Sequence, residues 1–228
     1  MNIKITGSGS YIPTEVVSNI DFAQHTFLND DGTPFPHPND VVAEKFLEIT
    51  GIHERRYVSD DLCTSDIALI AAEKAIKDAK IDRETLDYII LAHNFGDVKK
   101  GAIQSDILPS LATRVKHGLK IKNPKCVAYD ILFGCPGWVE GVIQAYAFIK
   151  AGMAKKCLVI GAETLSRVVD LHDRDSMIYS DGAGATIVEA TNDEGGILAH
   201  ETATFTYDEA YYLFFGNSFN KDHDPDVR

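Results

Sequence analysis

Apolar residues form two kinds of segment, which take turns along the chain. One kind is a short apolar run, and the other is a longer stretch in which apolar residues recur every three or four positions. The short runs are rich in β-branched and aromatic residues, which is typical of strands. They predict strands at residues 2–8, 55–57, 88–92, 125–131, 157–162, 181–188 and 196–205. The longer stretches predict helices at 40–49, 64–79, 103–117 and 136–151. This alternation predicts an α/β fold with three layers, in which helices cover both faces of a mainly parallel central sheet.

Local signals refine the boundaries of these elements. Thr64 or Ser65 can cap the helix at 64–79, and Pro109 interrupts the helix at 103–117. Gly152 suits the C′ position that closes the helix at 136–151. Residues 26–39 contain one glycine and three prolines, so we expect a surface loop that covers a neighbouring part of the molecule.

Composition narrows the classes of function. The chain has 228 residues, of which 45% are hydrophobic and 25% charged, enough to bury a core as a soluble globular protein. A net charge of −12 without a local basic cluster argues against nucleic-acid binding. The N-terminal residues lack the pattern of a signal peptide, and no apolar stretch is long enough to span a membrane. We therefore expect a cytoplasmic protein whose partners are small molecules or proteins.

The spacing of the cysteines and glycines points to no bound group. Cys63, Cys126, Cys135 and Cys157 have no paired spacing, so neither disulfides nor a zinc site is expected, and a reducing compartment fits. The stretch at 7–10, GSGS, is a weak match to a dinucleotide-binding turn because the third glycine is missing and no helix pattern follows directly. The sequence thus indicates no metal and no cofactor.

Cys135 is the strongest candidate for a reactive group. It follows the predicted strand at 125–131 through a tight turn and opens the helix at 136–151, with Gly134 and Gly137 on either side. Helix N-terminal amides are unpaired and carry the positive end of the helix dipole, so they favour the thiolate, which is the nucleophilic form of cysteine. We expect Cys135 to act as a nucleophile, although most free cysteines are small buried residues.

Four stretches resemble, in the same order, motifs of the β-ketoacyl-[acyl carrier protein] synthase III group of the thiolase superfamily. The aromatic-Asp strand that leads into Cys135-Pro136-Gly137-Trp138 is similar to that group's C-x-G-[FW] motif. The other stretches are residues 7–13 (GSGSYIP), 50–56 (TGIHERR) and 181–185 (DGAGA). The resemblance implies a thiolase-like half and a decarboxylative Claisen condensation. Cys135 would carry the acyl group, and a malonyl thioester would lose CO₂ and attack it.

The same resemblance implies a His and an Asn that stabilise the developing charge, and both come from the second half of the family fold. Of the eight histidines in this chain, the candidates for a substitute are His93, just after a predicted strand, and His200, inside another, and neither has the family context. We therefore expect the N-terminal half of an enzyme, with a domain at 1–206 and the start of a connection to the missing half at 207–228. Such a chain would be inactive alone. It would be a truncated product, a proteolytic remnant or one subunit of a split enzyme, and of these we favour truncation. The alternative is a non-catalytic partner that binds acyl chains or another chain.

The resemblance also bears on substrates. The Trp and Arg that hold coenzyme A adenine in the group would fall on Lys45 and Ile49, so that platform is absent. Arg174 matches an arginine that contacts the nucleotide or phosphates, but it could instead pair with Asp170 or Asp173 on a loop. The implied substrates are an acyl thioester, either acyl-CoA or acyl carrier protein, and malonyl-acyl carrier protein, in fatty-acid or related lipid biosynthesis.

Further expectations concern assembly and rival chemistry. The family fold implies a homodimer, across which Glu163 and Arg167 could pair, although such residues are more often merely solvated. Trp138 is expected to pack in the core rather than to contact substrate. Hydrolysis by a Cys-His pair would require His93 or His200 to lie beside Cys135.

Overall fold

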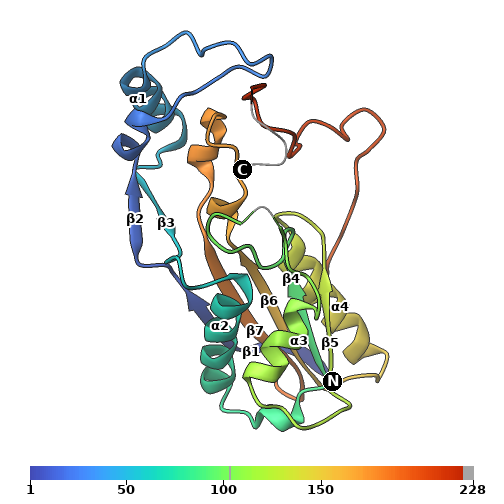
Figure 1. Cartoon of the computed structure of the whole chain (residues 1–228). Helices are drawn as coiled ribbons and strands as arrows, with labels where there is room; N and C mark the ends of the chain where they lie inside the picture. Colours follow the sequence, from blue (N-terminus) through green and yellow to red (C-terminus); the bar gives the residue numbers. More distant parts are fainter. Residues whose placement is uncertain (103, 223–228) are drawn as a thin grey trace.

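The computed structural model describes residues 1–102 and 104–222, and a five-stranded sheet forms its centre (Figure 1). The strand order is β1-β7-β6-β4-β5. The strands are β1 (Asn2–Tyr11), β4 (Tyr88–Ala92), β5 (Val127–Ile131), β6 (Lys156–Glu163) and β7 (Gly182–Thr191). Strand β4 pairs in parallel with β5 and β6, while β7 runs antiparallel to its neighbours β1 and β6. Four strands therefore share one direction, and the predicted mainly parallel α/β fold is confirmed.

Helices cover the two faces of this sheet. Helix α2 (Thr64–Ala79) and α3 (Leu111–Gly118) pack on one face, and α4 (Gly137–Lys150) packs on the other. Four alanines of α2 are fully buried and let the helix approach β1 closely: Ala68, Ala71, Ala72 and Ala75. A Cβ at Gly7 or Gly9 would lie 2.5 Å or 2.3 Å from backbone atoms of α2. These glycines therefore serve helix–strand packing, which accounts for the weak dinucleotide-binding signal at residues 7–10.

A smaller unit sits above one end of the central sheet (Figure 1). It contains a two-stranded antiparallel sheet of β2 (Glu15–Ser18) and β3 (Glu54–Tyr57), and the helix α1 (Asn39–Thr50), which lies between these strands along the chain. Its core is built from Phe22, Phe27, Val42 and Met177. Arg55 is buried within it and donates to the carbonyls of Val17 and Met177 and to the Asn19 side chain. The bond to Met177 links the unit to the short 3₁₀ helix η4 (Arg174–Ile178), which follows β6 and the 3₁₀ helix η3 (Leu165–Arg167) along the chain. Two further 3₁₀ helices are η1 (Asn19–Gln24) and η2 (Arg83–Thr85).

The predicted helix at 103–117 is wrong in its first half. Helix α3 begins only at Leu111, after Pro109, and Ser110 caps it by accepting from the Thr113 amide. Proline disfavours helical backbone in the residue before it and supplies no N–H, so the helix cannot extend back through Pro109. Residue 103, the predicted start, lies outside the described residues. At α2 the N-cap is Cys63 rather than Thr64 or Ser65, and Asp66 accepts the Cys63 amide in return.

The predicted strand at 196–205 is also wrong. This segment has no regular structure, and its one backbone hydrogen bond to the sheet runs from the Ile197 amide to the Ile3 carbonyl. Gly195 and Gly196 adopt positive φ angles of 82° and 124°, which lie outside the extended backbone conformation of a strand. Leu198 in this segment is 87% exposed. The alternating apolar residues at 196–205 therefore do not make a strand, because no neighbouring strand in the described part of the chain pairs with them and buries their side chains. Within the described residues, no helix is long and apolar enough to cross a membrane.

Candidate active site

Cys135 lies at the turn between β5 and α4, at the carboxyl end of the parallel strands. Gly134 has a φ angle of +67°, and its carbonyl accepts from the Gly137 amide at 3.0 Å. Pro136 is the N-cap and Gly137 the first helical residue, so Cys135 precedes the cap rather than sitting in the first helical turn. The thiol is exposed. The structure therefore places Cys135 at the expected strand–turn–helix junction, shifted by one residue.

The other cysteines lie in environments that oppose ionisation. Burial raises the pKa of Cys63, of Cys126 and of Cys157, in the last case to about 12. Cys126 and Cys157 are buried in the two cores of the sheet, and Cys63 caps α2. Cys135 is thus the exposed thiol of the four and the one available to a reagent or substrate.

Asn94 connects the ends of three neighbouring strands at this site. It follows β4, and its backbone N–H and side-chain Nδ2 both donate to Oε2 of Glu163 at the end of β6, at 2.7 and 2.9 Å. Its Oδ1 accepts from the Gly134 amide, after β5, at 3.1 Å. Burial raises the pKa of Glu163, although the hydrogen bonds from Asn94 act in the opposite direction. The turn that carries Cys135 is therefore tied to a partly buried carboxyl group through one amide side chain.

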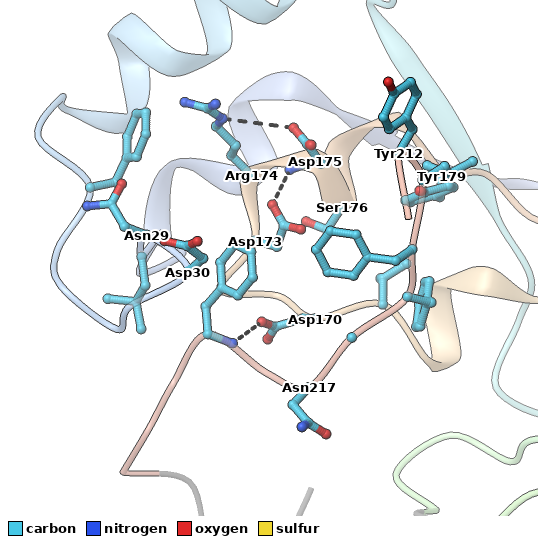
Figure 2. Close-up of a pocket in the computed structure, with 18 residues that line it drawn as sticks. Asn29, Asp30, Asp170, Asp173, Arg174, Asp175, Ser176, Tyr179, Tyr212 and Asn217 are labelled. Atoms are coloured by element: carbon cyan, nitrogen blue, oxygen red, sulfur yellow. Dashed lines mark hydrogen bonds and ion pairs between the residues drawn. The ribbon is translucent and has the colours of Figure 1, made fainter. Parts of the chain in front are cut away.

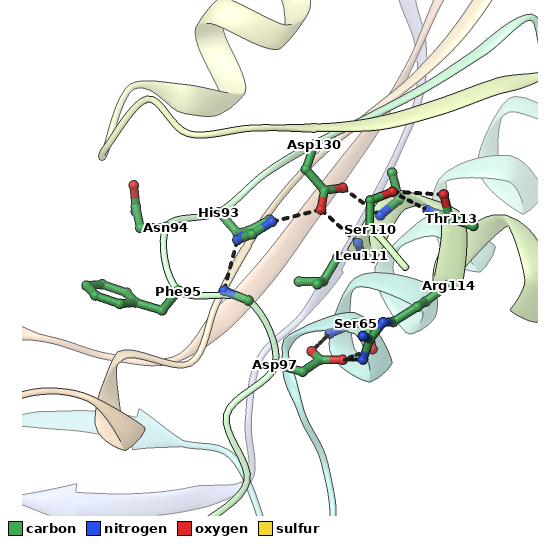
Figure 3. A network of polar contacts seen from close by, with 12 residues as sticks. Ser65, His93, Asn94, Phe95, Asp97, Ser110, Leu111, Thr113, Arg114 and Asp130 are labelled. Carbon is green, nitrogen blue, oxygen red and sulfur yellow. Dashed lines mark hydrogen bonds and ion pairs between the residues drawn. The ribbon is translucent and has the colours of Figure 1, made fainter. Parts of the chain in front are cut away.

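His93, the neighbour of Asn94, belongs to a separate network (Figure 3). Its Nε2 lies 2.9 Å from Oδ2 of Asp130, and its Nδ1 accepts from the Gly96 amide at 3.0 Å. Asp130 also accepts from the amides of Leu111 and Ala112 at the start of α3, each at 2.7 Å. Burial opposes the ionisation of Asp130, but the hydrogen bonds from His93 and these amides outweigh it, and its pKa is lowered.

Neither candidate histidine is placed to serve Cys135 as a base. His93 is buried and has both ring nitrogens engaged. The ring of His200 packs edge-on against Tyr146 at 5.5 Å, well along α4 from its first residue, Gly137. Among the described residues, no hydrogen bond reaches the Cys135 sulfur. The Cys-His hydrolase hypothesis therefore has no geometric support within the described chain.

A cavity of about 380 Å³ opens beside this end of the sheet. Figure 2 shows its wall, which is formed by the loop before α1, by the η4 region and by the C-terminal segment. Lining residues include Leu28, Asp30, Phe35, Asp170, Asp173, Arg174, Asp175, Tyr179, Phe214 and Asn217. Burial raises the pKa of Tyr179, and the nearby Asp175 and Cys135 add to that rise. Tyr179 lines the cavity, whereas Cys135 is not among its lining residues.

Arg174 lines this cavity, and its ion pair is with neither Asp170 nor Asp173. Its Nε lies 3.8 Å from Asp175 rather than from Asp170 or Asp173. Its guanidinium lies 4.5 Å above the Phe35 ring, a cation–π contact. Sequence reasoning missed Phe35 and Tyr179, and the only signal for Phe35 was its place between two prolines in the loop. Lys45 pairs with Glu48 at 2.6 Å and Ile49 is 82% exposed, and neither lines the cavity.

Three other residues have structural roles within the chain. Trp138 packs against Gly161 and donates from Nε1 to Thr186 at 3.3 Å, as a core residue. Glu163 is held by Asn94, and Arg167 donates to the carbonyls of Val58 and Ser59. Both residues thus have partners within the chain, but Nε of Arg167 is buried and has no hydrogen-bond partner among the described residues. The suggested pair of Glu163 with Arg167 across a dimer stays a prediction.

Residues 129–205, which include Cys135, match the family model described as 3-oxoacyl-[acyl-carrier-protein (ACP)] synthase III. The chain is 39% identical over 196 residues to the β-ketoacyl-[acyl-carrier-protein] synthase III of Neisseria gonorrhoeae (strain NCCP11945). That match covers 86% of this chain and 54% of the relative. The chain thus spans about half the length of the curated relatives it matches.

Solved structures agree with this likeness. The 3-oxoacyl-[acyl-carrier-protein] synthase III from Aquifex aeolicus VF5 aligns with a TM-score of 0.68 and 34% identity, covering 84% of this chain and 55% of the other. The β-ketoacyl-[acyl carrier protein] synthase III from Thermus thermophilus aligns with a TM-score of 0.67 and 33% identity, covering 85% and 53%. The resemblance inferred from the sequence motifs is confirmed, and with it the thiolase-type fold.

Proposed function

We propose that this chain, which is similar to β-ketoacyl-[acyl-carrier-protein] synthase III proteins and has their thiolase-type fold, serves as a condensing acyltransferase. In the proposed reaction, the Cys135 thiolate attacks the carbonyl of an acyl thioester, and the carrier thiol leaves. A malonyl thioester then loses CO₂, and its carbanion attacks the acyl group on Cys135, which leaves as thiolate. The product is a β-ketoacyl thioester of fatty-acid or related lipid biosynthesis.

One observation carries this proposal: Cys135 is the exposed thiol, and it lies directly before the N-terminus of α4. Backbone amides there are unpaired by the helix and suit a developing negative charge. The Gly134-Gly137 turn holds the sulfur outside the sheet, where an acyl group can reach it. The four free thiols suit the reducing cytoplasm, which is where we place the activity.

The test is acylation of the protein by acyl-CoA, acyl-acyl carrier protein and acyl-pantetheine, followed by intact and peptide mass spectrometry. We expect the mass of one acyl group on Cys135, and none in Cys135→Ala. Cys63→Ala is the matched control, because Cys63 is the next most accessible cysteine and should leave acylation unchanged. Acylation that persists in Cys135→Ala would contradict the proposal.

We assign the thioester carrier to the cavity that contains Arg174 and Tyr179. Arg174 is half exposed and stacked on Phe35, so it can meet a phosphate group of a carrier. Several aspartates share this wall, which disfavours the many charges of coenzyme A relative to the single phosphodiester of a carrier-protein arm. Arg174→Ala should raise KM for acyl-acyl carrier protein with little change in kcat. Arg56→Ala, which removes a partly exposed arginine paired with Glu54, is the control.

We also propose that the chain forms a homodimer through β5. This strand is one of the two edges of the central sheet, the other being β1, and Val127 on it is 45% exposed. Leu132 and Val139, just beyond β5 and on α4, are 70% and 48% exposed. Such an edge with adjacent apolar side chains is suited to pairing with a second copy. In analytical ultracentrifugation, Leu132→Lys should shift the protein toward monomer, and an unchanged sedimentation coefficient would contradict the dimer.

A second candidate is a thiolase-type chain that acts only with a further chain. It is favoured by the lack of an acid–base partner for Cys135 among the described residues. On this proposal residues 1–206 form the thiolase-like domain and residues 207–228 lead toward the chain that supplies a His and an Asn. Residues 223–228 lie outside the described structure. The two candidates differ in single-turnover assays: acylation without condensation favours the second.

A further inference from the structure

Asn94 and Glu163 connect the turn of Cys135 to the rest of the sheet. Strands β6, β4 and β5 are neighbours, and their carboxyl ends are in register, since Ala92 pairs with both Gly161 and Ile131. Glu163 ends β6, Asn94 follows β4, and Gly134 follows β5. The hydrogen bonds from Asn94 to Glu163 and from Gly134 to Asn94 therefore cross all three strand ends.

Gly134 is fixed at both of its backbone groups. Its amide donates to Oδ1 of Asn94, and its carbonyl accepts from the Gly137 amide. Because Gly134 has a positive φ angle, loss of either bond frees a residue that tolerates many backbone conformations. Cys135 is the next residue, so the position of its sulfur depends on this turn.

Glu163 decides which way the Asn94 amide faces. The carboxyl oxygen Oε2 accepts from the Asn94 backbone N–H and from Nδ2, so the NH₂ group must point to Glu163 and Oδ1 to Gly134. Without Glu163, the side-chain amide of Asn94 could rotate and turn its NH₂ group toward the Gly134 N–H, where two donors would face each other. The Glu163 carboxyl group thus orients Asn94, and Asn94 in turn holds the turn that carries Cys135.

We propose that Asn94, oriented by Glu163, is a positioning residue that holds the Gly134 turn in the conformation that presents the Cys135 thiol to an acyl thioester. This role rests on the proposed acyl transfer for its use, but the turn geometry can be tested without it. A displacement of about 1 Å at a reacting group costs on the order of a hundredfold in rate, so a loosened turn should act on acylation strongly.

The experiment compares Asn94→Ala with Asn123→Ala. Asn123 is a matched control because its side chain also accepts a backbone amide, from Lys125, and donates toward Glu84, but it precedes β5 at the opposite end of the sheet. Acylation of Asn94→Ala should fall at least about tenfold. Its alkylation by iodoacetamide should change much less, because a small reagent does not require a fixed sulfur position. Asn123→Ala should leave both rates unchanged.

Two further measurements separate positioning from general loosening. Amide hydrogen exchange of a peptide containing residues 131–137 should speed up in Asn94→Ala and in Glu163→Ala, but not in Asn123→Ala. Glu163→Gln keeps an acceptor oxygen and should restore wild-type exchange and acylation. Unchanged exchange in Asn94→Ala, or an equal effect in Asn123→Ala, would overturn the role. If wild-type protein is not acylated while exchange responds as expected, the proposed function fails and the positioning role stands.

Discussion

Two adjacent residues, His93 and Asn94, lead into polar clusters of opposite character. His93 joins Asp130 and the first amides of α3 in a cluster that is closed, with each ring nitrogen paired. Asn94 joins Glu163 and the Cys135 turn in a cluster whose sulfur is exposed. The pKa of Asp130 is lowered by its hydrogen bonds against the effect of burial, whereas burial raises that of Glu163. The His93–Asp130 cluster stabilises the fold. The Asn94–Glu163 cluster holds the turn of the reactive Cys135, and the burial of the Glu163 carboxylate lowers the stability of the protein.

The two carboxyl groups therefore respond to pH with opposite signs. Because the folded-state pKa of Asp130 is lowered, its contribution to stability is present above its unfolded value of 3.8 and is lost in acid. Because the folded-state pKa of Glu163 is raised, its contribution is present below 4.5 and is lost as pH rises through the raised value. At neutral pH the first stabilises the protein and the second does not.

The largest expected effect comes from breaking the closed cluster. Asp130→Ala removes the acceptor of His93 and of two amides, so the free energy of unfolding should fall by about 2–4 kcal/mol. Urea denaturation at neutral pH measures this. Asp193→Ala is the control, because Asp193 is 80% exposed and 4.0 Å from Lys4. A loss no greater than in the control would show that the cluster is not a main source of stability.

A smaller effect is expected at Gly137, the first residue of helix α4, which packs against Ala92 of strand β4. A Cβ at Gly137 would lie 2.8 Å from the Cβ of Ala92, which cannot move without moving β4. Gly137→Ala should therefore cost about 1–2 kcal/mol and slow acylation of Cys135 by shifting the start of α4. Gly184→Ala has no atom within 4 Å of the added Cβ and is the control. Wild-type stability and acylation in Gly137→Ala would refute the close contact.

The smallest expected effect has the opposite sign. Glu163→Gln removes a carboxyl whose ionisation burial opposes, so the variant should be slightly more stable than wild type at pH 8 and closer to it at pH 4.5. Thermal unfolding at the two pH values measures the difference. Glu201→Gln, at an exposed glutamate, should show no such dependence. A stability loss at pH 8 would mean that the charge of Glu163 is favourable, which contradicts the contrast with Asp130.

Local patterns determined most of the architecture. Apolar runs predicted β4, β5 and β6 nearly to the residue, and helical spacing predicted α1, α2 and α4. The strand, glycine turn and helix around Cys135 lie within one short segment, so its placement before a helix N-terminus was readable as well. Two predictions failed. Residues 196–205 have an alternating apolar pattern but pair with no strand among the described residues, and the residues before Pro109 cannot join α3 because proline ends the helical backbone there.

Only the tertiary structure decided what surrounds the cysteine. Asn94 lies 40 residues from Gly134 and 69 from Glu163 along the chain, and the parallel pairing of β4 with β5 and β6 brings them together. Arg174 and Phe35 meet in the same way, through the packing of two loops. Sequence by itself determined which segments become strands and helices and where the thiol falls, because those depend on neighbouring residues. The groups that hold and orient that thiol depend on contacts between distant segments, which exist only once the sheet has formed.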